Sequence, residues 1–246
     1  MLIRAVLFDY GDTLIVGKKP DQEIIPEALK ESFRAFKKNG VDMNYQTYVE
    51  QDMRVFRKYA EMEKAEQRDI PDRVKYVELL SVLCPELPAA KRRRIASEAN
   101  TAFWNSVTNR HTIRKGTKTT LSELRRMGLR MAVISNHHNP DSLRGHLRHL
   151  GISSYFSRVL ASSELPYRKP DPRIFRMCAS ELMLEPTECV FVGDSVPFDI
   201  AGANGVGMLT ILIRNGRSDA KGETSKPDFA VQDLREIPDI VKKANS

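Results

Sequence analysis

Four short polar runs lie near the ends of apolar stretches of the chain, and their residue types could together bind and attack a phosphoryl group. The runs are Asp9 to Leu14, Ser135-Asn136, Lys169-Pro170 and Gly193-Asp194-Ser195. A carboxylate can attack phosphorus, a hydroxyl can hold phosphoryl oxygens, and an ammonium group offsets the negative charge that develops during transfer. We therefore expect the four runs to form one phosphate site.

The apolar stretches near these runs indicate what positions them. They lack clean alternation, which is typical of strands buried on both faces of a parallel sheet. Because the carboxyl ends of parallel strands share one edge, Asp9, Ser135 and Asp194 are expected to meet there. From about residue 112 onward, helix and strand patterns alternate. The sequence predicts an α/β fold, a Rossmann-like parallel sheet with helices on both faces.

The segment between Pro20 and Arg110 carries only helix patterns. Four amphipathic stripes are separated by Asn39-Gly40, by Pro71 and by Pro85 with Pro88. These stripes predict a small all-helical bundle inserted after the first strand. We expect residues 17–110 to form this bundle, and residues 1–16 and 111–246 to form the sheet domain.

The charge of the chain bears on which partners it can bind. The chain of 246 residues has a net charge of +7 and a pI near 9.3, so a nucleic-acid partner has to be considered. Residues 17–110 hold 18 Lys and Arg against 15 Asp and Glu, so the positive charge is spread along the chain and we expect no nucleic-acid partner. The run of basic residues at 91–94 lies in a helical pattern and is expected on a solvated surface.

Three other features favour a cytoplasmic protein that does not enter the membrane. Cys84, Cys178 and Cys189 are far apart, which predicts neither disulfides nor a zinc site. The N-terminal strand pattern is interrupted by Arg4 and Asp9, unlike a secretory signal. We find no stretch that approaches the roughly 18 to 20 apolar residues of a membrane span.

The motifs FDYGDTL, VISN, RKPDP and GDSVPFD occur in that order along the chain. This order resembles the haloacid dehalogenase superfamily of phosphohydrolases, and the inserted helices resemble its helical cap. Each motif alone is a weak signal, but four in order with the cap in the expected place are a strong one. The resemblance covers essentially the whole chain and implies a Mg²⁺-dependent phosphohydrolase that acts on a small phosphorylated metabolite.

The resemblance also assigns roles to residues. Asp9 is the expected nucleophile, which forms an aspartyl-phosphate. Asp9, Asp194 and the main-chain carbonyl of Gly11 are the expected Mg²⁺ ligands, since this hard cation prefers oxygen. Ser135 and Lys169 complete the expected catalytic set. The remaining expectations are a loop-fixing hydroxyl at Thr13, phosphoryl contacts at Asn136, and at Asp199 a carboxylate that orients metal-bound water or Lys169.

The first motif departs from the usual phosphatase pattern. A second aspartate, which protonates the leaving oxygen, usually stands two residues after the nucleophile, and this chain has Gly11 there. Asp12 follows at the next position, where glycine is usual. Asp12 is thus a candidate acid and base that would act from a shifted loop. Alternatively, the substrate has a good leaving group, such as an acyl phosphate, or hydrolysis is slow.

Two alternative functions remain open. One is a catalytically weak phosphate-binding or regulatory protein on the same fold, for which Gly11 is the main support. The other is a phosphonate-cleaving relative, which would need a cap lysine, and Lys18 and Lys19 are candidates by position. Outside the catalytic set, we expect His137 and His138 in a solvated loop and Trp104 in the core of the helical bundle.

Overall fold

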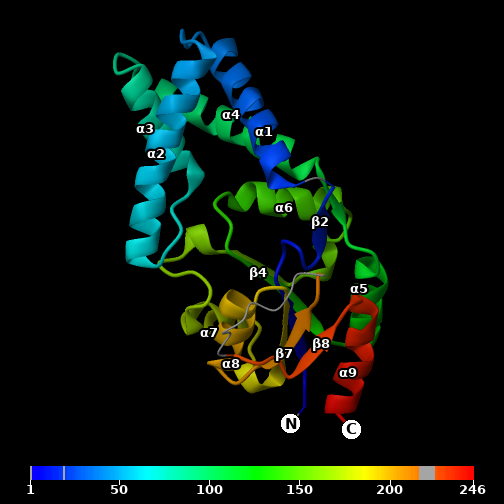
Figure 1. Cartoon of the computed structure of the whole chain (residues 1–246). Coiled ribbons are helices and arrows are strands. Elements are labelled where there is room, and N and C mark those ends of the chain that lie inside the picture. Colours follow the sequence, from blue (N-terminus) through cyan, green and yellow to red (C-terminus); the bar gives the residue numbers. More distant parts are fainter. Residues whose placement is uncertain (1, 19, 216–224) are drawn as a thin grey trace.

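The computed structural model describes residues 2–18, 20–215 and 225–246, and it contains a six-stranded parallel sheet (Figure 1). The strands lie in the order β5-β4-β1-β6-β7-β8. Their bounds are β1 Ala5–Phe8, β4 Arg130–Ser135, β5 Arg158–Ala161, β6 Cys189–Gly193, β7 Leu209–Ile213 and β8 Phe229–Val231. The apolar strand β1 is fully buried at the centre of the sheet, between β4 and β6.

Helices cover both faces of this sheet. On one face, α5 (Thr117–Arg126), α6 (Pro140–His149) and α9 (Ile237–Ala244) pack against side chains such as Val6 and Phe8. On the other face, α7 (Pro172–Glu181) packs against Leu7, Ala132 and Phe191, and α8 (Ala201–Asn204) contributes Ala203 to the same core. Alternate residues of β1 therefore enter opposite cores, as its unbroken apolar sequence requires.

Four helices between β2 and β3 form a helical cap with its own hydrophobic core. Their bounds are α1 Asp21–Lys38, α2 Tyr45–Glu66, α3 Asp72–Leu83 and α4 Ala89–Thr108. Phe36, Tyr48, Tyr76, Leu80 and Ile95 are buried among them. The predicted α/β fold with an inserted all-helical cap is therefore confirmed.

The cap joins the sheet domain through a two-stranded antiparallel ribbon of β2 (Ile15–Gly17) and β3 (His111–Ile113). Figure 1 shows α6 beneath α1 and α4, between the cap and the sheet, and α4 contacts α6. The short 3₁₀ turns are Ser153–Tyr155, Ser162–Glu164, Pro186–Glu188 and Leu234–Glu236, and Val196–Ile200 is a π-helical turn.

Two predictions from composition can be compared with the structure. The three cysteines are free and buried, so none of them is in a disulfide. Within the described ranges, every helix is too short or too polar to cross a membrane.

Candidate active site

Three predicted site residues meet at one edge of the sheet because adjacent strands end at the same level. Phe8 of β1 is paired with Val133 of β4 and with Val192 of β6. Asp9 therefore follows the central strand at the edge where β4 ends with Ser135 and where β6 leads into Asp194. Asp9 and Ser135 are both buried, and Asp194 is partly exposed.

Lys169 links two carboxylates at this edge. Its Nζ donates hydrogen bonds to Asp9 Oδ1 and to Asp199 Oδ1, each at 2.7 Å. Lys169 is only 2% exposed and Asp9 only 7%, so water screens these ion pairs little. Burial alone would lower the pKa of Lys169, but the charges of Asp199 and Asp9 outweigh it and raise this pKa. Lys169 is therefore a fixed positive charge beside Asp9.

The three carboxylates at the site crowd one another. Asp9, Asp194 and Asp199 each offer an oxygen, and these oxygens lie within 4.8 Å of one another. Burial raises the pKa of Asp9 to about 6, against the lowering effect of Lys169. Burial, with the charges of Asp9 and Asp199, raises the pKa of Asp194 to about 7. A divalent cation that prefers oxygen would offset this repulsion, so the donor set fits Mg²⁺.

Asp199 is held in place by the backbone around Gly193. The Ser195 N–H donates to Asp199 Oδ2 at 3.0 Å, while the other oxygen of Asp199 accepts from Lys169. A Cβ at Gly193 would overlap the Asp199 side chain. Glycine at 193 is therefore required for the close approach of Asp199. Asp199 lies against Lys169, which agrees with one of the two contacts that the resemblance implied.

The Asn136 side chain binds the main chain of Lys169, and the phosphoryl contact expected from backbone N–H groups around Asn136 stays a prediction. Its Nδ2 donates to the Lys169 carbonyl at 3.0 Å, and its Oδ1 accepts from the Lys169 N–H at 2.9 Å. These two hydrogen bonds fix the main chain of Lys169 to the loop that follows β4. The Asn136 amide thus orients Lys169 in this structure.

The loop after Asp9 is held by residues that the motifs did not indicate. Arg114 donates to the carbonyls of Asp12 and Thr13, and Asn215 donates to the Asp12 carbonyl at 2.8 Å and to Asp194 Oδ2 at 3.3 Å. The Thr13 hydroxyl is buried and has no hydrogen-bond partner among the described residues. The role expected for this hydroxyl stays a prediction, and Arg114 and Asn215 hold the loop carbonyls in the described residues.

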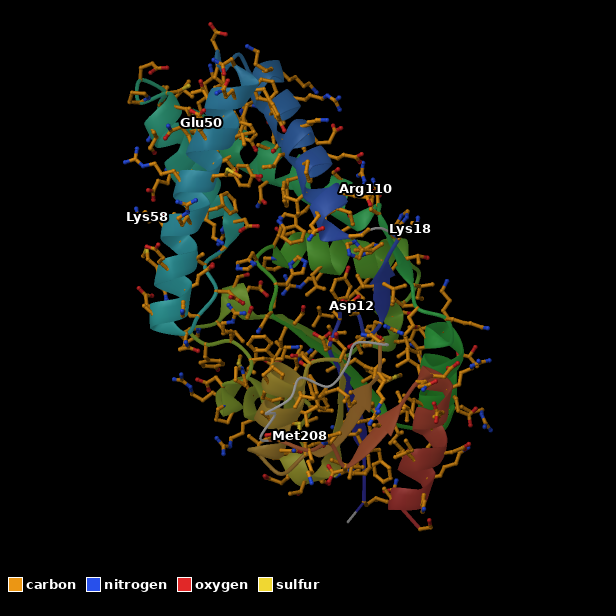
Figure 2. The ribbon with its side chains drawn as sticks, in the orientation of Figure 1. Asp12, Lys18, Glu50, Lys58, Arg110 and Met208 are labelled. Carbon is orange, nitrogen blue, oxygen red and sulfur yellow. The ribbon has the colours of Figure 1, made fainter. Side chains whose placement is uncertain are left out.

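Gly11 and Asp12 differ in backbone conformation. A Cβ added at Gly11 would have no atom within 4 Å, and the φ of Gly11 does not lie in the left-handed region, so neither space nor backbone requires glycine. Asp12 has a φ of +52°, a conformation that aspartate tolerates better than most residues. The Asp12 charge contributes to the raised pKa of Asp194, and it opposes the lowering of the Arg114 pKa by burial. Figure 2 shows Asp12 below the helical cap.

His137 is buried, contrary to the expected solvated loop. It is 7% exposed, and its ring lies 4.4 Å from the ring of Trp104. Burial, with the charge of His138, lowers the pKa of His137 to about 3, so its ring is neutral. Trp104 donates from Nε1 to Asp72 Oδ2 at 3.0 Å and faces the sheet domain. The expectation that Trp104 lies in the core of the helical bundle is wrong, because it packs between cap and sheet domain.

A second acidic cluster connects the cap to the sheet domain. Asp69 of the cap pairs with Arg168 at 2.6 Å and accepts a hydrogen bond from Ser162. Ser162 in turn accepts from the His137 N–H at 3.1 Å. Arg168 directly precedes Lys169, and His138 Nε2, which lies 3.6 Å from Asp69 Oδ1, follows Asn136 in its loop, so Asp69 touches two of the loops that carry site residues.

The same cluster contains three possible metal ligands, Glu63, Asp69 and His138, whose donor atoms lie within 4.8 Å of one another. Lys75 lies 2.9 Å from Glu63, and Arg168 pairs with Asp69. Because these two cations already compensate the carboxylates, the geometry favours an ion-pair network over a metal site.

A six-stranded parallel sheet with an acidic cluster and a buried lysine at its carboxyl edge defines a Rossmann-like α/β protein, here with an inserted helical cap. The chain matches the haloacid dehalogenase-like hydrolase family over residues 3–207, and it belongs to this family. The resemblance of its motifs to that family is therefore confirmed.

Individual relatives extend this finding. The chain is 28% identical over 245 residues to a glyceraldehyde 3-phosphate phosphatase of Methanopyrus kandleri, a match that covers 98% of each chain. It is 39% identical over 117 residues to a phosphoserine phosphatase of Thermus thermophilus, which covers 48% of this chain and 46% of that protein. A 2-haloacid dehalogenase structure from Pseudomonas syringae has a TM-score of 0.76 at 22% identity, with coverage of 99% and 100%, and so shares the fold.

Proposed function

We propose that this protein is a Mg²⁺-dependent phosphohydrolase that forms an aspartyl-phosphate on Asp9 and acts on a small phosphorylated metabolite. The observation that carries the proposal is the buried Asp9 carboxylate at the carboxyl edge of the sheet, paired at 2.7 Å with a Lys169 that Asp199 also holds. Several family relatives are phosphatases of small phosphate esters, such as glyceraldehyde 3-phosphate, phosphoserine and phosphoglycolate. These relatives support the same substrate class here.

The residues of the site suit both halves of such a reaction. In the first half, one Asp9 oxygen attacks phosphorus, the bond to the leaving oxygen breaks, and the leaving group takes a proton. In the second half, water attacks the aspartyl-phosphate, and phosphate leaves with regeneration of the Asp9 carboxylate. Lys169 offsets negative charge on the phosphoryl oxygens, and the Ser135 hydroxyl lies at the same edge to bind one of them.

Asp9, Asp194 and the Gly11 carbonyl are the proposed ligands of Mg²⁺. The crowded carboxylates around Asp194 fit this cation. When bound, Mg²⁺ would neutralise charge on the transferring group and bring the anionic phosphate close to anionic Asp9. Asp199 is already held by Lys169 and by the Ser195 N–H, so we assign it the positioning of Lys169.

Two residues of the first motif bear on the proton donor to the leaving group. Gly11 lacks an acid, and Asp12, from its left-handed position, acts electrostatically on Asp194 and Arg114. A substrate with a good leaving group would not require a strong acid. Asp12 is the candidate acid for poorer leaving groups.

We further propose that residues 17–110 act as the cap and that residues 1–16 and 111–246 form the catalytic domain. We also propose that the protein works in the cytoplasm without a nucleic-acid partner.

The alternative of a weak phosphate-binding or regulatory protein is supported by Gly11. The phosphonate-cleaving alternative rests on Lys18 and Lys19. Lys18 is exposed beside Arg110, to whose carbonyl its N–H donates at 2.9 Å (Figure 2), and Lys19 lies outside the described residues.

A test of the proposed function measures phosphate release from acetyl phosphate, p-nitrophenyl phosphate and alkyl phosphates, with Mg²⁺ and with a chelator. We expect turnover of the activated substrates that requires Mg²⁺. Asp9→Asn is the matched variant, because it keeps the shape of the side chain and removes the nucleophile. Equal rates for wild type and Asp9→Asn on every substrate would refute a phosphohydrolase mechanism on Asp9.

A further inference from the structure

The carboxylate of Asp69, a cap residue, is buried against the sheet domain. Asp69 lies between α2 and α3 and is only 1% exposed, and Figure 1 shows the end of α2 beside the sheet domain. Its Oδ1 lies 2.6 Å from Arg168 Nη1, and its Oδ2 accepts a hydrogen bond from the Ser162 hydroxyl. Among the described residues, Asp69 is the one carboxylate that pairs with Arg168.

The Asp69–Arg168 ion pair leads directly to the proposed catalytic lysine. Arg168 precedes Lys169 in the chain, and the Lys169 main chain makes hydrogen bonds of 2.9 and 3.0 Å with the Asn136 side chain. The Lys169 ammonium group in turn donates to Asp9. The ion pair therefore holds the chain next to the group that offsets charge at the nucleophile.

The Ser162 contact leads back to the same lysine through the loop after β4. The His137 N–H donates to Ser162 Oγ at 3.1 Å, and the Ser162 hydroxyl donates to Asp69. His137 directly follows Asn136, whose side chain holds the Lys169 main chain. These contacts form a closed ring to which Asp69 is the contribution of the cap. Replacement of Asp69 would open the ring where its two loops meet.

Stability alone does not account for a charged pair at this position. The Asp69 side chain has no exposed surface, and the Arg168 side chain is 26% exposed. The cost of removing such charges from water offsets most of their attraction, so a buried ion pair contributes little net stability. Loss of one partner, by contrast, leaves the other charge uncompensated and free to move. The pair therefore acts mainly on the position of the Arg168–Lys169 segment.

We infer that Asp69 is a positioning residue of the cap, which holds through Arg168 and Ser162 the two loops that set the place of Lys169. The inference rests on the proposed phosphohydrolase function, in which Lys169 offsets charge on the phosphoryl group. It makes the chemical step depend on a buried cap residue outside the carboxylate cluster at Asp9. The dependence should hold even for a substrate with a small leaving group.

The first measurement is kcat for acetyl phosphate in Asp69→Asn and in Arg168→Met. Asp69→Asn keeps the shape of the side chain and removes the charge that holds Arg168. In both variants kcat should fall by roughly tenfold to a hundredfold, because a displacement of about 1 Å in a catalytic group costs up to about a hundredfold. Arg168→Lys should recover most of this loss, because the pair joins a single nitrogen to a single carboxylate oxygen.

The double variant tests the route of the effect. If Asp69 acts through Arg168, Asp69→Asn combined with Arg168→Met should lower kcat by much less than the product of the two single losses. A merely structural effect of two independent substitutions would multiply. Losses that multiply would therefore overturn the inference.

A second measurement needs no substrate. Hydrogen–deuterium exchange read by mass spectrometry follows the Lys169 amide, which donates to Asn136 and precedes a proline. In Asp69→Asn this amide should exchange at least about tenfold faster, because local opening of the segment no longer breaks the ion pair. An unchanged exchange rate would overturn the inference.

Asp52→Asn is the matched control, because it makes the same change at another buried carboxylate of the cap. Asp52 lies on α2, and its pKa is raised to about 7 by burial and by the charge of Asp72. Its neutral form is thus already populated at pH 7, so the amide should leave the fold intact. We expect wild-type kcat and wild-type exchange at Lys169. A loss equal to that of Asp69→Asn would overturn the inference.

The outcomes separate the inference from the proposed function. Hydrolysis of acetyl phosphate by the wild type, with unchanged kcat in Asp69→Asn and Arg168→Met, would overturn the positioning role and leave the phosphohydrolase standing. If the wild type hydrolyses no substrate, the proposed function fails and the exchange rates decide on Asp69. If Asp69→Asn does not fold, the same comparisons use Arg168→Met, whose side chain is partly exposed.

Discussion

Replacement of Gly11 by aspartate tests whether the missing acid limits this enzyme. A Cβ at position 11 meets no atom within 4 Å, and the φ of Gly11 does not lie in the left-handed region, so the side chain can be added without strain. A compatible Gly replacement stabilises a fold by about 0.4–1 kcal/mol through the unfolded chain. The new negative charge lies near Asp9 and Asp194, and at this exposed position its repulsion lowers the free energy of unfolding by a similar amount. We therefore expect a nearly unchanged melting temperature.

The expected change lies in catalysis of esters with poor leaving groups. A positioned acid and base contributes roughly 10²- to 10⁴-fold, or about 3–5 kcal/mol of barrier. Gly11→Asp should therefore raise kcat on glycerol 3-phosphate by at least about a hundredfold. Acetyl phosphate, whose leaving group needs little protonation, should change by less than about threefold, since general acid catalysis contributes little there.

The assay measures kcat for both substrates in wild type, Gly11→Asp and Gly11→Asn. Gly11→Asn adds a side chain of nearly the same shape without an acid, so it should show no gain. A similar gain in both variants, or no gain in Gly11→Asp, would refute the view that the missing acid limits turnover. Asp12→Asn completes the set, because a large loss on poor leaving groups would assign the proton donor to Asp12.

Three further predictions follow from buried groups at the site. Lys169→Met leaves Asp9 and Asp199 without their shared cation, so kcat on acetyl phosphate should fall by more than about a hundredfold. The free energy of unfolding in urea should fall by about 3–5 kcal/mol, because two buried carboxylates lose their partner. A wild-type rate would contradict the role assigned to Lys169. Gly193→Ala should abolish most activity, because its Cβ would displace the Asp199 side chain. Gly145→Ala is the control for loss of glycine alone, because its backbone is not left-handed and its Cβ would lie 3.8 Å from the Arg148 side chain. The pKa of His137 is about 3 in the folded state and near 6.5 unfolded, so the unfolded state binds more protons as the pH falls, and stability should drop by about 2 kcal/mol between pH 7 and pH 5. His137→Phe should remove that part of the pH dependence, and an unchanged slope in urea titrations would show that His137 is not its source.

Much of the site could be predicted from strand ends. Asp9, Ser135 and Asp194 follow buried apolar runs, and parallel pairing forces such positions to one edge. The helical cap was also predictable, because proline and Asn-Gly positions divide its amphipathic stripes. Both predictions depend on local pattern and on a general property of parallel sheets.

The remaining contacts depend on loops that approach one another only in the folded chain. Nothing near Arg114 or Asn215 in the sequence indicates that they hold the carbonyl of Asp12. His137 resembles a loop residue until Trp104 of the cap covers it. Asn136 likewise bonds to Lys169, which is 33 residues away. A single sequence records these residues but not their neighbours.

The central position of β1 has a consequence for how the chain is made. Ala5 at the start of this strand pairs with Arg130 and with Cys189, so β1 leaves the ribosome before both of its neighbours in the sheet. The helical cap, whose contacts are local, can fold while β1 still waits for its partners. Activity therefore arises late in synthesis, once the segment through Asp199 has emerged. A chain interrupted before that point would hold a folded cap, an unpaired apolar strand that promotes aggregation, and no catalytic centre.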